Sequence, residues 1–289
     1  MTITASMVKE LRERTGSGMM ECKKALKEVG GDMELAVEHL RKTGLAKADK
    51  KASNIAAEGL IGYAADGKAA VLVEVNCQTD FVSGGDEFAA LTKKVTDTVI
   101  ANRPADVEAL LAIEVDGESL ETTRRNLIAK IGENMNVRRF QILETSDRIA
   151  HYAHGNRISV LVAMQGGDDA VARDVAMHIA ASNPQFISAD NVPADVLDKE
   201  REILIEQAKG EGKPENIVAK MVEGRVRKFL AEITLEGQAF VKDPDTTVGK
   251  LLASNNAKVT GFVRYEVGEG IDKKEENFAD EVMAQVRSN

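Results

Sequence analysis

Apolar residues at helical spacing fill the N-terminal segment, and glycines divide it into three parts. The pattern predicts a helix that Thr4 or Ser6 caps and that ends at Gly16, a second that ends at Gly30, and a third that Asp32 caps and Gly44 closes. The stretch AKADKKASN that follows is rich in lysine and lacks large apolar side chains, which is typical of a solvated helix end or a linker. We therefore place a domain boundary there and predict a three-helix N-terminal domain over residues 1–54.

The next part of the chain contains an internal repeat. Residues 63–75, YAADGKAAVLVEV, match residues 152–164, YAHGNRISVLVAM, at a constant offset of 89. In each copy a polar turn leads to a buried strand and then to an amphipathic helix, and a later strand supplies a further partner. The fold class is therefore α+β, with core subdomain N over 55–145 and core subdomain C over 146–190 and 232–270. The helices are predicted at 86–100 and 168–181, and the later strands at 136–144 and 259–267.

The second copy carries a long insert that the first copy lacks. Apolar residues at helical spacing in 193–209 and 214–231 predict a helical hairpin over 191–231, with Pro214 at the first helical position of its second arm. The apolar seam of the hairpin is narrow, so we expect part of its apolar face to pack on another surface, such as the same hairpin of a second chain. A C-terminal helical module is predicted over 271–289, with its helix beginning near Lys274.

The stretch VEVNCQTDFVSGGDEF, residues 73–88, places a phenylalanine in a short polar turn between a buried strand and a helix. Thr79 or Asp80 can cap this turn by satisfying free backbone N–H groups, and Phe81 and Val82 follow. The second copy has QGGDDAVA at the same place, so the turn is an addition to the shared scaffold. Additions at loops usually carry function.

Composition narrows the classes of function. The chain has 289 residues, of which 43% are hydrophobic, which is enough for two or three domains with their own cores. Its net charge of -9 disfavours direct contact with nucleic acid. It has no apolar run of about 18 residues and no charged-then-apolar leader, so we expect a cytosolic protein with no membrane contact. Cys22 and Cys77 lack CxxC spacing, and we expect both thiols to be reduced.

Signals for enzyme chemistry are weak. Cys77 ends the buried strand, where it is either a nucleophile or a small buried apolar residue, and the sequence assigns it no histidine and acid partners. His151 and His154 have HxxH spacing without a nearby acidic residue to complete a metal site. No glycine-rich stretch has the pattern of a phosphate-binding loop. We expect no catalytic residue, no metal and no cofactor.

Binding signals are stronger, and they begin with two adjacent methionines. Met20 is expected to close the core of the three helices, whereas Met19 is a candidate for contact with a partner, because thioethers adapt to irregular surfaces. Lys23 and Lys24 are most simply a solvated helix face.

Two segments resemble the signature regions of a known family. LRERTGSGMMECKKAL, residues 11–26, and EVNCQTDFVS, residues 74–83, are similar to those of elongation factor Ts, the nucleotide exchange factors of elongation factor Tu. The similarity continues through IGENMNVRR, HIAASNPQF, KMVEGRV and VTGFVRYEVGEG. Gly84 departs from the family pattern, which usually has a basic or amide side chain there.

The resemblance implies a function and a set of contact residues. It implies that the N-terminal domain is ubiquitin-associated-like and docks on the GTPase domain of elongation factor Tu through Arg12, Met19, Met20 and Lys23. It implies that Thr79, Asp80, Phe81 and Val82 are pushed in near the partner's magnesium and phosphate site, so that GDP is released. It also implies that subdomain C grips another domain of the partner, that the hairpin supports a homodimer, and that the C-terminal module returns to the GTPase domain. A Cys77-dependent thiol enzyme and a passive helical adaptor stay open as alternatives.

Overall fold

The computed structural model of the chain describes residues 2–210 and 215–272. Two compact units are present. The first comprises Met1–Gly62, Val73–Phe140 and Val267–Asn289, and the second comprises Tyr63–Leu72 and Gln141–Glu266. The chain therefore passes from one unit to the other more than once, and each unit is described separately below.

Three helices open the first unit: α1 (Ala5–Thr15), α2 (Met19–Glu28) and α3 (Met33–Lys51). Thr4 caps α1 through its hydroxyl, and Gly16 ends that helix with a φ of 67°. Asp32 caps α3 by accepting a hydrogen bond from the backbone N–H of Leu35 at 2.9 Å. The buried core of the bundle consists of Val8, Leu11, Cys22, Ala25, Leu26 and Ala36. These caps and this core confirm the predicted three-helix N-terminal segment.

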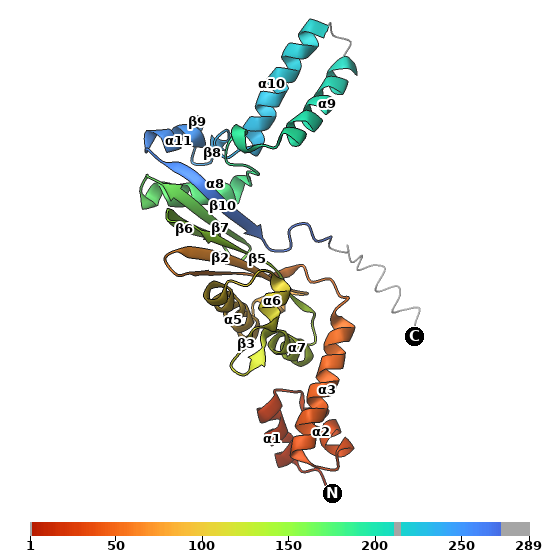
Figure 1. Cartoon of the computed structure of the whole chain (residues 1–289). Coiled ribbons are helices and arrows are strands. Elements are labelled where there is room, and N and C mark those ends of the chain that lie inside the picture. The colour runs from red at the N-terminus through yellow and green to blue at the C-terminus, as the bar shows by residue number, and fades with distance from the viewer. Residues whose placement is uncertain (1, 211–214, 273–289) are drawn as a thin grey trace. The chain divides into compact units, whose positions relative to one another are not determined.

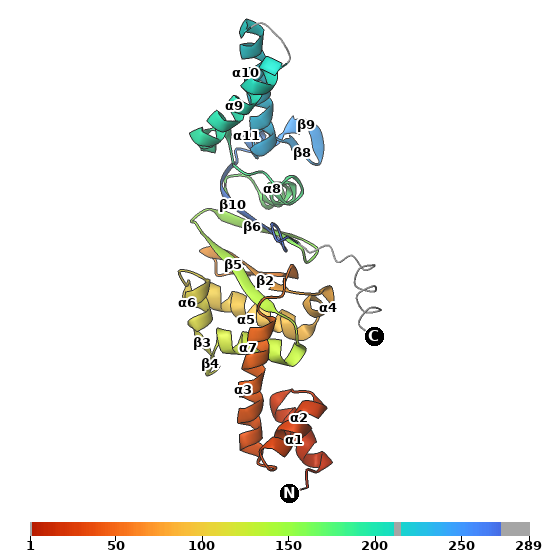
Figure 2. The same cartoon turned by 90° about the vertical axis from the view of Figure 1, so that its right-hand side faces the viewer.

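The predicted end of the third helix is wrong, because α3 continues through Gly44 into the lysine-rich stretch. The cause is a tertiary contact. A Cβ atom added at Gly44 would lie 2.9 Å from Cβ of Ala129 on helix α7 (Leu120–Ile131), so the glycine allows two helices to approach closely. Arg125 of α7 also forms an ion pair with Asp49 of α3. Figures 1 and 2 both show α3 beside α7.

The first copy of the repeat forms a three-stranded sheet in the order β1-β2-β5. Its strands are β1 (Glu58–Ala65), β2 (Ala69–Cys77) and β5 (Met135–Glu144), and every residue of β2 is buried. Within the first unit, helices lie on one side of β2 and β5 (Figures 1 and 2). The elements between β2 and β5 are α4 (Asp80–Ser83), α5 (Asp86–Asn102), α6 (Val107–Ala112), β3 (Glu114–Val115), β4 (Glu118–Ser119) and α7.

The second copy has the corresponding strand order, β10-β7-β6. The strands β6 (Arg148–His154), β7 (Ile158–Gln165) and β10 (Lys258–Glu266) are antiparallel, and Val162 of β7 pairs with Ala150 on one side and Phe262 on the other. Helix α8 (Asp169–Ser182) covers one face of this sheet (Figure 1). The repeat in the sequence is thus a repeat of structure. No sequence pattern predicted β1 and β6, which lie at the edges of the sheets opposite β5 and β10.

The insert of the second copy is a helical hairpin, as predicted, formed by α9 (Ala194–Gly210) and α10 (Glu215–Ile233). Leu204, Ala208, Val222 and Val226 form its buried seam. Pro214 and the C-terminal helix expected within 271–289 lie outside the described residues. The second unit is completed by the 3-10 turn Ala189–Asn191, β8 (Ala239–Phe240), β9 (Asp243–Thr247) and α11 (Val248–Ser254).

Glu74 of β2 is a fully buried carboxylate in the first unit. Arg138 and Arg139 of β5 donate to it at 3.0 and 2.6 Å, and the backbone N–H of Gly268 donates at 2.8 Å. A Cβ atom at Gly268 would lie 2.2 Å from the carbonyl oxygen of Ala57, and its φ is 74°, so only glycine fits there. Glu74 therefore ties the segment after β10 to β2.

Candidate functional site

The Phe81 turn lies between the buried strand β2 and helix α5, where the sequence predicts it. It is a helix of four residues, α4, and it has no buried side chain of its own. The backbone N–H of Gly84 donates to the carbonyl oxygen of Asp80 at 2.9 Å, and that of Gly85 donates to Val82 at 3.0 Å. The two glycines thus end one short helix before Asp86 begins the next.

Thr79 caps this short helix, since its hydroxyl oxygen accepts a hydrogen bond from the backbone N–H of Val82 at 3.4 Å. The alternative that Asp80 provides the cap is wrong. Asp80 is the first residue of α4 and is exposed to solvent, where its carboxylate complements the positive end of the helix instead.

Phe81 is 88% exposed. It is therefore not a core residue of this chain, although a neighbouring aromatic residue is. Phe88, in the first turn of α5, is fully buried. A large apolar side chain held in water has no stabilising role in its own fold, so Phe81 is available to another molecule.

Two residues that follow α7 hold the strand end from which the turn begins. Glu133 accepts hydrogen bonds from Thr79, at 3.1 Å from the backbone N–H and at 2.7 Å from the hydroxyl. Asn134 donates its backbone N–H to the side-chain oxygen of Gln78 at 2.8 Å. Glu133 has no role predicted from the sequence, since nothing in a linear pattern relates it to a residue 54 positions earlier.

The thiol of Cys77 is buried directly beneath the turn, and its Sγ donates to the carbonyl oxygen of Thr79 at 3.2 Å. Burial, reinforced by the carboxylates of Glu133 and Glu58, raises the pKa of Cys77 to about 12. A nucleophilic cysteine needs an accessible thiolate at neutral pH. The environment of Cys77 is therefore that of a small buried residue and not that of a nucleophilic thiolate.

The predicted contact residues of the N-terminal helices are all exposed. Arg12 lies in the last turn of α1, Met19 and Met20 open α2, and Lys23 follows one turn later. The expectation that Met20 closes the bundle core is wrong, since Met20 is 76% and Met19 59% exposed. Cys22 fills the core position instead, because the helical turn directs it and not Met20 toward Leu11 and Leu26.

The HxxH histidines do not form a common site. Alternation along β6 places His151 and His154 on opposite faces of the strand. His151 stacks on Tyr63 with a centroid distance of 3.7 Å and hydrogen-bonds Ser159 at 2.8 Å, which is a structural role. Among the described residues, no group of three or more His, Cys, Asp and Glu side chains is arranged to hold a metal ion.

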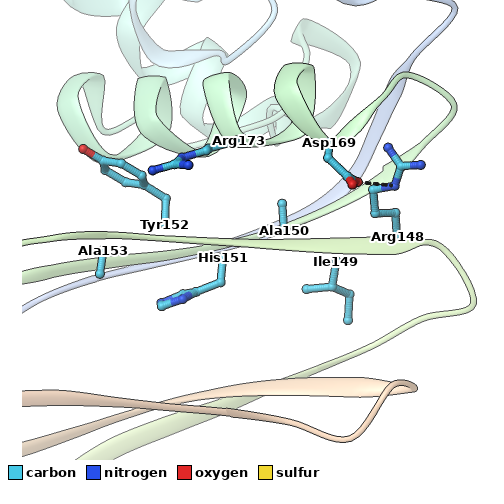
Figure 3. Close-up of a pocket in the computed structure, with 8 residues that line it drawn as sticks. All are labelled: Arg148, Ile149, Ala150, His151, Tyr152, Ala153, Asp169 and Arg173. Carbon is cyan, nitrogen blue, oxygen red and sulfur yellow. Dashed lines mark ion pairs between the residues drawn. The ribbon is translucent and has the colours of Figure 1, made fainter.

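The second unit contains two pockets that the sequence did not indicate. One has a volume of about 350 Å³ and lies along β6, where Arg148, Ala150 and Tyr152 point toward α8 (Figure 3). Arg148 and Arg173 are among its lining residues, and Arg148 is paired with Asp169 at 3.3 Å. The other, of about 470 Å³, is mainly apolar and is lined by residues that include Ile158, Met177, Ala180 and Val241.

The chain is similar to a known family and to several proteins that share one name. The model of the family "Elongation factor TS" matches residues 78–269, more than half of the chain. A protein named elongation factor Ts from Methylococcus capsulatus is 61% identical over 293 residues, covering 100% of both chains. Its namesake from Halorhodospira halophila is 59% identical over 291 residues, again covering 100% of both, and that from Idiomarina loihiensis is 58% identical over 286 residues, covering 99% and 98%. None of the helices in the described ranges combines the length and apolar character that crossing a membrane requires.

Proposed function

The chain belongs to the elongation factor Ts family of translation factors, and we propose that it binds elongation factor Tu in its GDP form and accelerates the release of GDP in the cytoplasm. Elongation factor Ts is a nucleotide exchange factor and not a catalyst of a chemical reaction. The observation that carries the proposal is the exposed Phe81 on a capped turn at the end of a buried strand.

Thermodynamic linkage explains what such a turn has to do. A factor that speeds nucleotide release binds the empty partner more tightly than the loaded one, and the nucleotide weakens the factor's binding by the same ratio. A group on the factor must therefore disturb the nucleotide site. In this proposal, Thr79 holds the turn, Phe81 and Val82 insert between elements of the partner near its magnesium and phosphate site, and Asp80 perturbs the polar network there.

A second contact is proposed for the N-terminal helices. The proposed patch consists of two exposed thioethers, those of Met19 and Met20, and two exposed cations, those of Arg12 and Lys23. We assign this patch to docking on the GTPase domain, since Met side chains adapt to an irregular partner surface and the cations add orientation. Separate patches raise affinity, because the second contact forms within an existing complex.

The remaining parts of the chain receive structural roles in the same proposal. Subdomain N, residues 55–145, carries the Phe81 turn. Subdomain C, residues 146–190 and 232–270, grips another domain of elongation factor Tu. The apolar pocket near Val241 offers a surface of subdomain C for that contact. The hairpin over 191–231 mediates a homodimer, in which the exposed Ile203 and Ile217 would be covered. The C-terminal module predicted over 271–289 returns to the GTPase domain in this proposal.

Stopped-flow release of a fluorescent GDP from elongation factor Tu tests the proposal. We expect the purified chain to raise the release rate with increasing concentration until the rate saturates. A passive helical adaptor would bind the loaded factor without changing the rate, so a titration that shows binding but constant release would support that alternative. No direct role for nucleic acid, metal or cofactor enters the scheme.

A further inference from the structure

The four-residue helix α4 cannot hold its own geometry. A helix of one turn is unstable alone, because helix nucleation is unfavourable and only later turns compensate for it. No side chain of α4 is fully buried, and Val82 and Ser83 are only half-buried, so packing alone does not fix the helix. The direction in which Phe81 points must therefore be set by polar contacts from outside the helix.

Glu133 supplies two of these contacts to a single residue. Its Oε2 accepts the backbone N–H of Thr79 and its Oε1 accepts the hydroxyl proton of Thr79, so one carboxylate binds both donors. A hydroxyl has one proton and two lone pairs. Because the proton is donated to Glu133, a lone pair is left to accept the N–H of Val82, and that bond is the cap of α4.

The neighbouring contacts make this arrangement rigid. Gln78 accepts the backbone N–H of Asn134 at 2.8 Å and the side-chain amide of Asn54 at 3.1 Å. Two consecutive residues after α7 thus hold two consecutive residues before α4. Glu133 itself is placed by Gly132, which ends α7 with a φ of 89°.

We propose that Glu133 is a positioning residue for nucleotide release, which aims Phe81 by fixing the hydroxyl and the backbone of Thr79. This inference rests on the proposed exchange function. In it Glu133 acts through Thr79 and Phe81 and not by touching the nucleotide or the metal of the partner.

The test is a double-mutant cycle between Glu133→Ala and Phe81→Ala, read by GDP release at saturating factor. We expect Glu133→Ala alone to slow maximal release about fivefold, as for loss of one helix cap, with a smaller effect on the half-saturating concentration. In the Phe81→Ala background the same change should have a clearly smaller effect, since only Asp80 and Val82 of the turn are then left to misplace. Equal fold-changes in both backgrounds would overturn the inference, as would no change in the wild-type background.

Matched variants separate positioning from general stability. Glu87→Ala removes a carboxylate that pairs with Lys130 at 2.7 Å, joining α5 to α7 without touching Thr79, and it should leave maximal release unchanged. Thr79→Val, which removes the hydroxyl that links Glu133 to the cap of α4, should behave like Glu133→Ala. Should Glu133→Ala fold poorly, Glu133→Gln keeps the side-chain shape and is expected to show a smaller loss in the same cycle.

A measurement on the free chain distinguishes failure of this inference from failure of the proposed function. The amide of Val82 should exchange with deuterium several-fold faster in Glu133→Ala than in wild type and should be unaffected in Glu87→Ala. Unchanged exchange in Glu133→Ala would overturn the inference whatever the release assay gives. If deuterium exchange at Val82 is faster in Glu133→Ala but the wild-type chain does not accelerate GDP release from elongation factor Tu at all, the proposed function is wrong.

Discussion

Phe81 and Phe88 lie in adjacent helices and have opposite environments. Phe88 is fully buried in α5, whereas Phe81 is 88% exposed in α4. Burying such a side chain is worth about 1.5 to 3 kcal/mol, so a phenylalanine kept out of the core retains that free energy for a partner. The pair therefore provides an internal comparison of an aromatic ring that stabilises its own fold and one that does not.

We expect Phe81→Ala to slow factor-stimulated GDP release by about tenfold or more, because about 1.4 kcal/mol corresponds to one decade in rate. Its melting temperature should stay close to that of wild type, since the ring contacts no core. Phe88→Ala, in contrast, should lose about 3 to 5 kcal/mol of stability. Calorimetry and stopped-flow fluorescence on both variants check this, with the exposed Leu35→Ala as control for loss of a surface apolar group. A Phe81→Ala chain that melts several degrees lower yet releases GDP normally would contradict the assignment.

Cys77 should be chemically inert. With its pKa raised to about 12 by burial and nearby carboxylates, its thiol carries essentially no thiolate at pH 8. We expect iodoacetamide at pH 8 to leave Cys77 unalkylated in the native chain and to alkylate it fully in urea. Peptide mass spectrometry measures the alkylated fraction of Cys77. Cys77→Ser should retain GDP release, since a serine hydroxyl can donate to the same Thr79 carbonyl oxygen. Loss of release in a folded Cys77→Ser chain would restore the thiol-enzyme alternative.

Glu74 makes the stability of the first unit dependent on pH. Burial alone would raise its pKa, but hydrogen bonds from Gly268, Asn76 and Arg139 outweigh burial and leave the pKa of Glu74 lowered. The folded chain therefore binds fewer protons than the unfolded one, and this contribution is present above the unfolded pKa of about 4.3 and is lost as pH falls below it.

The corresponding prediction concerns Glu74→Gln. We expect this variant to be less stable than wild type at pH 7, because Arg138 and Arg139 lose their charged partner, and to lose less further stability between pH 5 and pH 3. Urea unfolding at each pH measures both effects. The exposed Glu108→Gln serves as control, and parallel loss of stability with pH in Glu74→Gln and wild type would refute the role given to Glu74.

At the scale of elements, sequence patterns correctly predict those helix starts and strands that depend on residues close together in the chain. Thr4 and Asp32 cap helices as expected, and both later strands occur within a residue or two of their predicted positions. Sequence patterns fail where a residue far away in the chain determines the end of a helix or the position of a turn. Gly44 does not end α3 because Ala129 packs against it, and Glu133 reaches the Phe81 turn only through the fold.

The hairpin α9–α10 should be dispensable for exchange in the monomer. Its base is held by the chain on either side, where Leu235 N–H donates to Phe186 at 2.8 Å and Gln185 N–H donates to Ile233 at the same distance. Replacing residues 194–230 with a short Gly-Ser linker keeps these bonds, so we expect release to be retained and self-association to change. Sedimentation and stopped-flow release measure the two properties. A well-folded deletion that no longer releases GDP would show that the hairpin takes part in exchange.

At the scale of the whole molecule, the repeat and the insert could be read from the sequence, but the division into units could not. Each of the two units is assembled from separate stretches of the chain, and the strands β1, β2 and β5 each contribute residues to both units. A boundary predicted from composition near residue 54 cannot detect this, because composition reports solvation and not which distant strands pair.

Truncation at two positions separates docking from packing. Removing residues 2–40 deletes α1, α2 and the first half of α3 but keeps Gly44 and Asp49 against α7. Removing residues 2–52 deletes that contact too. We expect both truncations to weaken binding to elongation factor Tu to a similar, large extent, since both lose Arg12, Met19, Met20 and Lys23. Only the longer truncation should lower the melting temperature substantially, and binding titrations with calorimetry check this. Unchanged affinity in either chain would remove the N-terminal patch from the proposed contacts.

The hydrogen bond between Gly268 and Glu74 also dictates an order of events during synthesis. Its two partners are 194 residues apart in the chain. At about 5 to 20 residues per second, a ribosome needs roughly 10 to 40 s to deliver Gly268 after Glu74. Throughout that interval Glu74, which the finished strand buries completely, has the guanidinium groups of Arg138 and Arg139 once they are made, but it lacks the N–H of Gly268. The first unit, although its first residues are made first, is therefore completed only after Glu266, the last residue of the second unit, has been made.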